Sequence, residues 1–256
     1  MLKRLRDYLI TYGLLATLAV MILAWTLLAL VLLAPLPQRA RRAGARYTMM
    51  AGFRLFTHVL TLSGAYRLDL TALDRLRGEP GLILAPNHPS AFDAILLQTR
   101  HPDLACILKP SLLNHPLLGI GARLAGYIRS EPPRRMVKGS VAELERGATV
   151  LLFPEGTRTR RSPVNPLTAS VAVIAKHARA SIQVAFIETD SPYLAKGWPP
   201  LKAPRLPIEY RVRLGRRLAP PEDLGQCMRE LEAEYAAGLA AAPQRAWLEA
   251  ARAEGP

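Results

Sequence analysis

The chain has 256 residues, with 34 lysines and arginines against 20 acidic residues, which gives a formal net charge of +14. Half of the residues are hydrophobic and only 21% are charged, which excludes a disordered polyelectrolyte. Two cysteines are too few for a disulfide-stapled fold, and the excess of positive charge points to an anionic partner.

Residues 9–36 contain no charged side chain and consist mainly of Leu, Ala, Val and Ile. As a helix this stretch would reach ~42 Å, more than the ~30 Å of a bilayer's hydrocarbon core, and it is too long for a cleaved signal peptide. Residues 1–46 are therefore predicted to form a membrane anchor with basic flanks. The pattern fits a spanning helix with the rest of the chain in the cytoplasm, and equally a helix that enters and leaves one leaflet by bending near Gly13 or Pro35.

Residues 47–64 carry apolar side chains at roughly helical spacing, among them Met50, Phe53, Phe56 and Leu60. This pattern predicts an amphipathic helix. Its apolar face suits the membrane interface and suits packing against the following domain equally well, so both interpretations stay open.

Residues 65–218 show short apolar runs alternating with helical patterns. The runs, which predict buried strands, are 82–85, 104–108, 127–128, 150–153 and 182–187. The predicted helices between them are 91–99, 112–124, 134–146 and 168–178. Such alternation predicts an α/β domain with a largely parallel sheet flanked by helices.

The end of the chain has two further patterns. Residues 208–214 alternate strictly between apolar and polar, which predicts a strand with one solvated face near a sheet edge. Residues 219–256 are predicted to form a C-terminal helix, over 224–242, and a tail that frays beyond Pro243.

A candidate catalytic pair follows the first predicted strand. His88 precedes Pro89, and Asp93 lies five positions after His88. Proline favours the first position of a helix, which would leave His88 just outside the helix and able to fold back toward Asp93. The carboxylate would then orient the imidazole, whose other nitrogen would act as a general base. His115, which also precedes a proline, has no acid five positions later and is interpreted as structural.

A candidate anion-binding loop follows the strand predicted at 150–153. It contains Glu155, Gly156, Thr157 and Arg158, with two further arginines at positions 160 and 161. Gly156 permits a tight turn, and arginine suits bidentate binding of phosphate. Glu155 would hold an arginine or accept a hydrogen bond from a hydroxyl.

Together the two loops resemble the first and third signature blocks of the glycerolipid acyltransferases, a family that includes 1-acyl-glycerol-3-phosphate acyltransferase. The resemblance covers residues 82–187. It implies that His88 is the general base for the acceptor's hydroxyl, with Asp93 orienting it. It also implies that Glu155, Gly156, Thr157 and Arg158 belong to the acceptor-binding loop, with Arg158 on the phosphate. Lys109, at a position that the family often keeps basic, is a further candidate for binding the acceptor's phosphate.

Two blocks depart from the family's pattern. At the second block the expected acid is replaced by Ser130 and the arginine comes early, so Arg129 is the candidate for a second phosphate contact, with Arg134 in reserve. The proline expected before the strand at residue 182 is also absent. These differences concern the identity of the acceptor more than the chemistry.

The resemblance implies an O-acyltransferase that moves a fatty acyl group from acyl-CoA or acyl carrier protein to the free hydroxyl of a lysophospholipid. A thioester has a good leaving group, so no bound cofactor or metal is expected, and the donor is a co-substrate. Membrane lipids are expected partners and nucleic acid is not, because aromatic residues are only 6% of the chain and no recognition motif occurs. The Ala/Arg-rich composition favours a bacterial inner membrane with a cytoplasmic active site.

Two alternatives remain. A membrane-bound lipid or thioester hydrolase would use the same base with water as acceptor, although the chain has no Gly-x-Ser-x-Gly motif. A non-catalytic basic protein that binds membranes would account for the charge without any chemistry.

Overall fold

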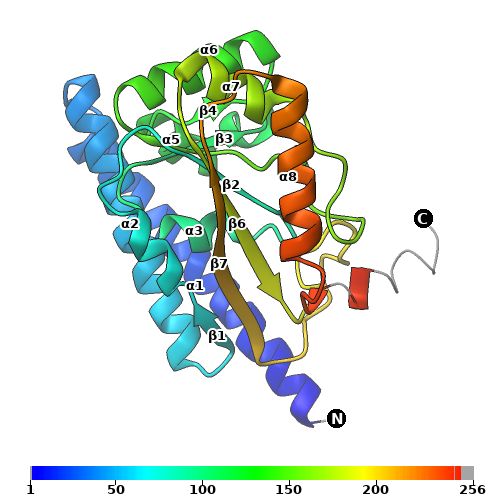
Figure 1. Cartoon of the computed structure of the whole chain (residues 1–256). Coiled ribbons are helices and arrows are strands. Elements are labelled where there is room, and N and C mark those ends of the chain that lie inside the picture. Colours follow the sequence, from blue (N-terminus) through cyan, green and yellow to red (C-terminus); the bar gives the residue numbers. More distant parts are fainter. Residues whose placement is uncertain (1, 245, 249–256) are drawn as a thin grey trace.

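The computed structural model describes residues 2–244 and 246–248, and it contains a seven-stranded sheet between two layers of helices (Figure 1). The strands are β1 (Tyr66–Asp69), β2 (Ile83–Pro86), β3 (Leu104–Leu108), β4 (Ile128–Arg129), β5 (Thr149–Leu151), β6 (Ile182–Thr189) and β7 (Ile208–Leu218). The helices are α1 (Leu2–Leu32), α2 (Gln38–Leu62), α3 (Asp93–Gln98), α4 (Pro110–Leu113), α5 (Leu118–Leu124), α6 (Pro133–Glu145), α7 (Ser170–Ala178) and α8 (Leu224–Gly238), with a 3-10 helix at Thr71–Leu76.

The strands lie in the order β1-β7-β6-β2-β5-β3-β4. Every neighbouring pair is parallel except β6 and β7, which are antiparallel. The prediction of an α/β fold with a largely parallel sheet is therefore confirmed. Because β2, β5 and β3 are adjacent and parallel, the loops that follow them emerge at the same edge of the sheet, as in other open α/β folds.

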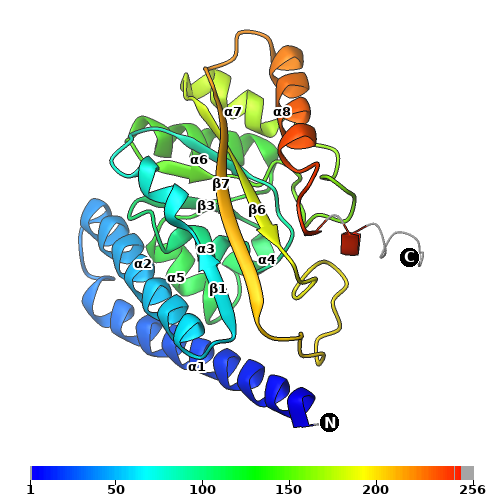
Figure 2. The ribbon, with the colours of Figure 1, turned by 60° about the horizontal axis from the view of Figure 1, so that its bottom comes forward.

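Helices cover both faces of the sheet (Figures 1 and 2). Side chains of β2 alternate between the two sides: Leu84 packs in a cluster with Phe56 of α2, whereas Ile83 packs in a second cluster with Leu231 of α8. Two buried faces explain why the central strands appear in the sequence as continuous apolar runs.

The two N-terminal helices pack against the domain and against each other. The second helix begins at Gln38, after Pro37, and not at the predicted residue 47, so the boundary at residues 46 and 47 falls inside α2. Arg46, assigned to the basic flank of the anchor, is buried and forms ion pairs of 2.6 Å with Asp103 and 2.7 Å with Glu143. These pairs tie α2 to the α/β domain. The functional division of the chain into anchor, amphipathic helix, domain and tail stays a prediction.

Other differences concern local boundaries. The helix predicted at 112–124 is interrupted between α4 and α5, where Pro116 cannot supply a backbone N–H. Strand β1 was not predicted, and it takes the edge position, so β7 is the second strand from the edge. The predicted C-terminal helix ends at Gly238, and most of the tail beyond Pro243 lies outside the described residues.

Candidate active site

The candidate catalytic pair lies where β2 ends. Helix α3 begins at Asp93, so Pro89 is in the connecting loop and not at the first helical position as predicted. A tight turn brings the pair together instead, because the backbone N–H of Asp93 donates to the carbonyl of Ser90 at 3.3 Å. The loop is fixed to the sheet by Asn87, whose side chain donates to Ile187 O at 2.9 Å and accepts from Ile187 N at 2.7 Å.

His88 and Asp93 contact each other directly. The Nδ1 atom of His88 lies 2.8 Å from Oδ2 of Asp93, and the side chains are 17% and 0% exposed. When Asp93 is ionised its carboxylate can only accept a hydrogen bond, which assigns the proton of a neutral His88 imidazole to Nδ1 and leaves a lone pair on Nε2. This is the arrangement that a histidine needs to remove a proton from a hydroxyl.

Asp93 is buried with limited compensation for its charge. Oδ2 also accepts a hydrogen bond from the backbone N–H of Ser90 at 2.9 Å, while Oδ1 has no hydrogen-bond partner among the described residues. Burial raises the pKa of Asp93 above its usual value, and His88, the Ser90 N–H and the charge of Arg158 partly offset that rise.

The imidazole of His88 is also held by the loop after β5. Its ring stacks on Phe153, with ring centroids 3.8 Å apart and an interplanar angle of 17°. The backbone of His88 is fixed as well: its N–H donates to Oε1 of Glu155 at 2.9 Å, and its carbonyl accepts from the N–H of Thr159 at 2.7 Å. Backbone and ring of the candidate base are therefore both oriented.

Glu155 joins the two loops. Besides His88 N–H, its carboxylate accepts from the hydroxyl of Thr159 at 2.6 Å and from the backbone N–H of Asn165 at 2.8 Å. Burial raises its pKa, and these hydrogen bonds partly offset the rise. The sequence suggested that Glu155 holds an arginine or accepts a hydrogen bond from a hydroxyl. In the structure it accepts from a hydroxyl, and that hydroxyl is the one of Thr159.

The next three residues of the loop shape its outer turn. Gly156 has a φ of 64°, a left-handed conformation that favours glycine. Arg158 is half-buried, and its Nη1 donates to the carbonyls of Leu194 at 2.7 Å and Ala195 at 3.0 Å. Arg158 therefore holds the segment between β6 and β7 in place beside the His88 loop.

A lysine that the sequence did not indicate lies at this turn. Lys196 donates from Nζ to the hydroxyl of Thr157 at 3.0 Å. Desolvation and the charges of Arg160, Lys109 and Arg158 lower the pKa of Lys196. Lys109 was predicted to belong to this region, but Lys196 lies 40 residues beyond the loop and nothing in its own sequence context marks it.

The structure places the remaining candidates on other elements. Arg129, at the end of β4, donates to Oδ1 of Asn114 at 3.0 Å, and Arg134 is exposed near the start of α6. The ring of His115 accepts from the backbone N–H groups of Leu117 and Leu118 at 3.3 and 3.2 Å, which is the structural role predicted for it. Within residues 2–244 and 246–248, no group of three His, Cys, Asp or Glu side chains is arranged to hold a metal ion.

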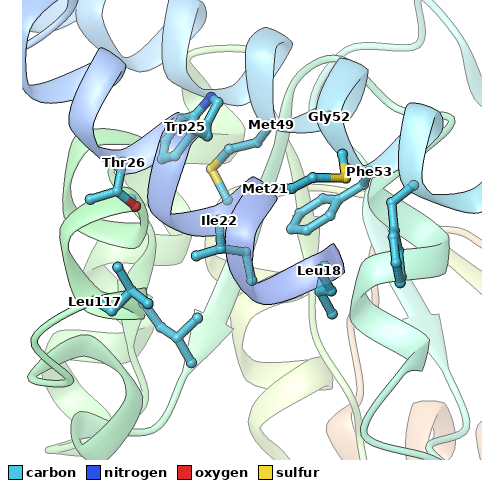
Figure 3. Close-up of a pocket in the computed structure, with 12 residues that line it drawn as sticks. Leu18, Met21, Ile22, Trp25, Thr26, Met49, Gly52, Phe53 and Leu117 are labelled. Atoms are coloured by element: carbon cyan, nitrogen blue, oxygen red, sulfur yellow. The ribbon is translucent and has the colours of Figure 1, made fainter. Parts of the chain in front are cut away.

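Two apolar pockets extend away from the pair. The first lies between α1, α2 and the start of α5 and encloses about 540 Å³ including its open side; Figure 3 shows Trp25 and Met49 on its wall. The second is lined by Phe92 of the His88 loop. Leu18 and Phe56 line both, so the two pockets are neighbours.

Comparisons with known proteins concern the family and the fold of the chain. The model of the family described as Acyltransferase matches residues 40–188. A 1-acyl-sn-glycerol-3-phosphate acyltransferase from Pseudomonas aeruginosa is 29% identical over 140 residues, which are 52% of this chain and 53% of the relative, so the chain spans about half the length of the curated relative it matches. The crystal structure of the 1-acyl-sn-glycerophosphate (LPA) acyltransferase PlsC from Thermotoga maritima has the same fold, with a TM-score of 0.69 and 17% identity, over 93% of this chain and 96% of that one.

Proposed function

This chain belongs to the acyltransferase family, and from that premise we propose that it transfers a fatty acyl group from a thioester donor to the free hydroxyl of a lysophospholipid, with 1-acyl-glycerol-3-phosphate as the acceptor. The observation that carries the proposal is the contact between His88 and the fully buried Asp93, beside the loop that contains Arg158. The donor is acyl-CoA or acyl carrier protein and acts as a co-substrate.

The chemistry follows from the orientation of His88. Its Nε2 takes the proton of the acceptor hydroxyl while that oxygen attacks the thioester carbonyl carbon. The carbon–sulfur bond then breaks, and the thiolate leaves and takes the proton from the imidazolium, so the histidine returns to its starting state. General-base assistance of this kind contributes about 10²–10⁴-fold, and positioning of the two substrates adds to it.

The N-terminal helices give the enzyme access to acceptors in a membrane. Helix α1 is long and apolar enough to cross a bilayer, with a mean hydropathy of 2.6 over its most apolar window. However, Arg4 near its start donates to Ala203 O at 3.3 Å, and Trp25 near its end packs on α5 at Gly121. Contacts with one domain at both ends support attachment to a single leaflet, since a spanning helix would carry one end to the opposite side.

The apolar surface of the two pockets is suited to a hydrocarbon chain. It comprises the pocket lined by Phe92, beside the pair, and the neighbouring pocket lined by Trp25, and the exposed face of α1 is also largely apolar. We therefore assign it to the acyl chain of one of the two substrates, held so that the reacting group lies at His88.

The test is acyl transfer by purified protein in detergent, with a panel of lysolipids and labelled acyl-CoA and acyl carrier protein. The proposal expects ester formation with 1-acyl-glycerol-3-phosphate, lost in His88→Ala and retained in His115→Ala, the matched histidine without an acid partner. Thioester hydrolysis that does not depend on the acceptor would identify a hydrolase. Membrane binding without any His88-dependent chemistry would identify a non-catalytic protein.

A further inference from the structure

Four basic side chains gather at the carboxyl edge of the sheet next to the catalytic pair. Lys109 follows β3, Arg158 and Arg160 follow β5, and Lys196 lies between β6 and β7. None of the four forms an ion pair with the residues described, whereas Arg42, Arg46 and other arginines elsewhere do. The cluster is therefore built from separate segments and forms no ion pair among the described residues, although the charge of Arg158 acts on Asp93.

Hydrogen bonds hold the segment that carries Lys196, whose own side chain is exposed. The carbonyl of Leu194 accepts from Nη1 of Arg158 at 2.7 Å and from the backbone N–H of Ala91 at 3.0 Å. The hydroxyl of Ser90 donates to the carbonyl of Tyr193 at 3.0 Å. The segment is thus attached to both loops of the active site, and Lys196 is directed to Thr157, with 3.0 Å between Nζ and Oγ1.

The positive charges of the cluster repel one another, and an anion bound among them would reduce this repulsion. Desolvation and the charges of Arg160, Lys109 and Arg158 lower the pKa of Lys196 below its usual value, as expected when like charges repel one another. A phosphate monoester carries close to two negative charges and accepts several charge-assisted hydrogen bonds. Such a ligand would satisfy the lysines and the unoccupied part of the Arg158 guanidinium together.

We propose that Lys196 binds the phosphate monoester of the lysophospholipid acceptor, together with Lys109 and Arg158. The inference rests on the proposed function and adds a residue to it. In 1-acyl-glycerol-3-phosphate the phosphate is on the carbon next to the one that bears the reacting hydroxyl. A phosphate site at Thr157 would likewise be close to the base. Glu155, two residues before Thr157, accepts a hydrogen bond from the backbone N–H of His88.

The experiment compares Lys196→Met, Lys196→Arg and Lys202→Met. Lys202 is the matched control, since it lies on the same segment but over the ring of Trp198, 5.1 Å from its centroid. We expect Lys196→Met to raise the KM for 1-acyl-glycerol-3-phosphate about ten- to hundredfold, the value of a hydrogen bond to a charged group. Lys196→Arg should keep most of the affinity, and Lys202→Met should behave as the wild type.

Two further measurements distinguish binding of the acceptor's phosphate from binding of a phosphate on the acyl donor. The KM for the acyl donor is measured on the same variants, and binding of 1-acyl-glycerol-3-phosphate is measured by calorimetry without any donor. An increase in the donor's KM alone, or unchanged acceptor binding in Lys196→Met, overturns the proposal. If the wild type binds the acceptor through Lys196 but transfers no acyl group, the phosphate site stands and the proposed function fails. If acyl transfer depends on His88 but Lys196→Met leaves the KM for the acceptor unchanged, the proposed function stands and the phosphate site at Lys196 is wrong.

Discussion

Nδ1 of His88 and Oδ2 of Asp93 are 2.8 Å apart, and the same Oδ2 accepts the backbone N–H of Ser90 at 2.9 Å. One carboxylate oxygen therefore orients the imidazole and closes the turn on which that imidazole is carried. The buried position that fixes Asp93 also disfavours its charge. Catalysis and stability consequently make opposite demands on this residue.

The first prediction is that Asp93→Asn lowers kcat by about 10²–10⁴-fold while it stabilises the fold at neutral pH. The amide of asparagine no longer enforces the Nδ1–H tautomer of the histidine. Asp→Asn substitutions in other histidine–carboxylate pairs lower kcat strongly for this reason. Stability changes in the opposite sense, because the neutral amide avoids burying a charge. Acyl-transfer kinetics and thermal unfolding of the same preparations check both parts.

The pH dependence of that stabilisation follows from the direction of the pKa shift. The pKa of Asp93 is raised in the folded protein, so ionisation costs stability as the pH rises from the unfolded value, about 3.9, through the folded value. The Tm of Asp93→Asn relative to the wild type should therefore grow over that window and then stay level. A Tm difference that is largest in acid would contradict the assignment.

The second prediction concerns Glu155. Its two oxygens accept three hydrogen bonds from protein donors, on His88, Thr159 and Asn165. In Glu155→Gln one oxygen becomes an NH₂ group and leaves at least one buried donor without a partner, at a cost of about 1–3 kcal/mol. We expect a lower Tm and a lower kcat, because the His88 backbone loses its support.

The matched control is Glu145→Gln on α6, since that glutamate is exposed. It should leave the Tm and kcat of the wild type unchanged. If Glu155→Gln instead raised the KM for the acceptor with kcat and Tm unaltered, Glu155 would contact the acceptor directly and would not tie the two loops together.

The features that could be predicted from the sequence are those that depend on residues close together in the chain. Strands β2 and β6 were predictable because both faces of the sheet are covered, and the His88–Asp93 contact because Asp93 is only five positions after His88. Lys196 could not be predicted, because hydrogen bonds between distant segments bring it to Thr157. Arg46 was misassigned for the same reason: its partners lie 57 and 97 residues away.

The third prediction tests the pocket between the helices. Gly52 of α2 lines it, and a Cβ at this position would have no atom within 4 Å, so a larger side chain fits without strain and occupies the pocket. Gly52→Leu should lower kcat/KM for long acyl chains about tenfold relative to short ones, as expected from the loss of about two buried methylenes. Chain length is varied separately in donor and acceptor.

Gly13→Leu is the control, because Gly13 also has open space around it but lies on an exposed part of α1 outside the pocket. Its chain-length profile should match that of the wild type. Equal losses for every chain length in Gly52→Leu would show that the pocket does not hold the acyl chain.

The fourth prediction concerns the attachment of α1. Nη1 of Arg4 donates to the carbonyls of Ala203 and Pro204 at 3.3 and 3.4 Å, so the beginning of the helix is held against the domain. A cysteine introduced as Lys3→Cys should therefore react with a membrane-impermeant maleimide from the same side of a vesicle as one introduced as Arg229→Cys on α8. The native thiols, Cys106 and Cys227, are buried and give a low background. Labelling of the two positions from opposite sides would mean that α1 crosses the bilayer and that the contacts of Arg4 do not form in the membrane.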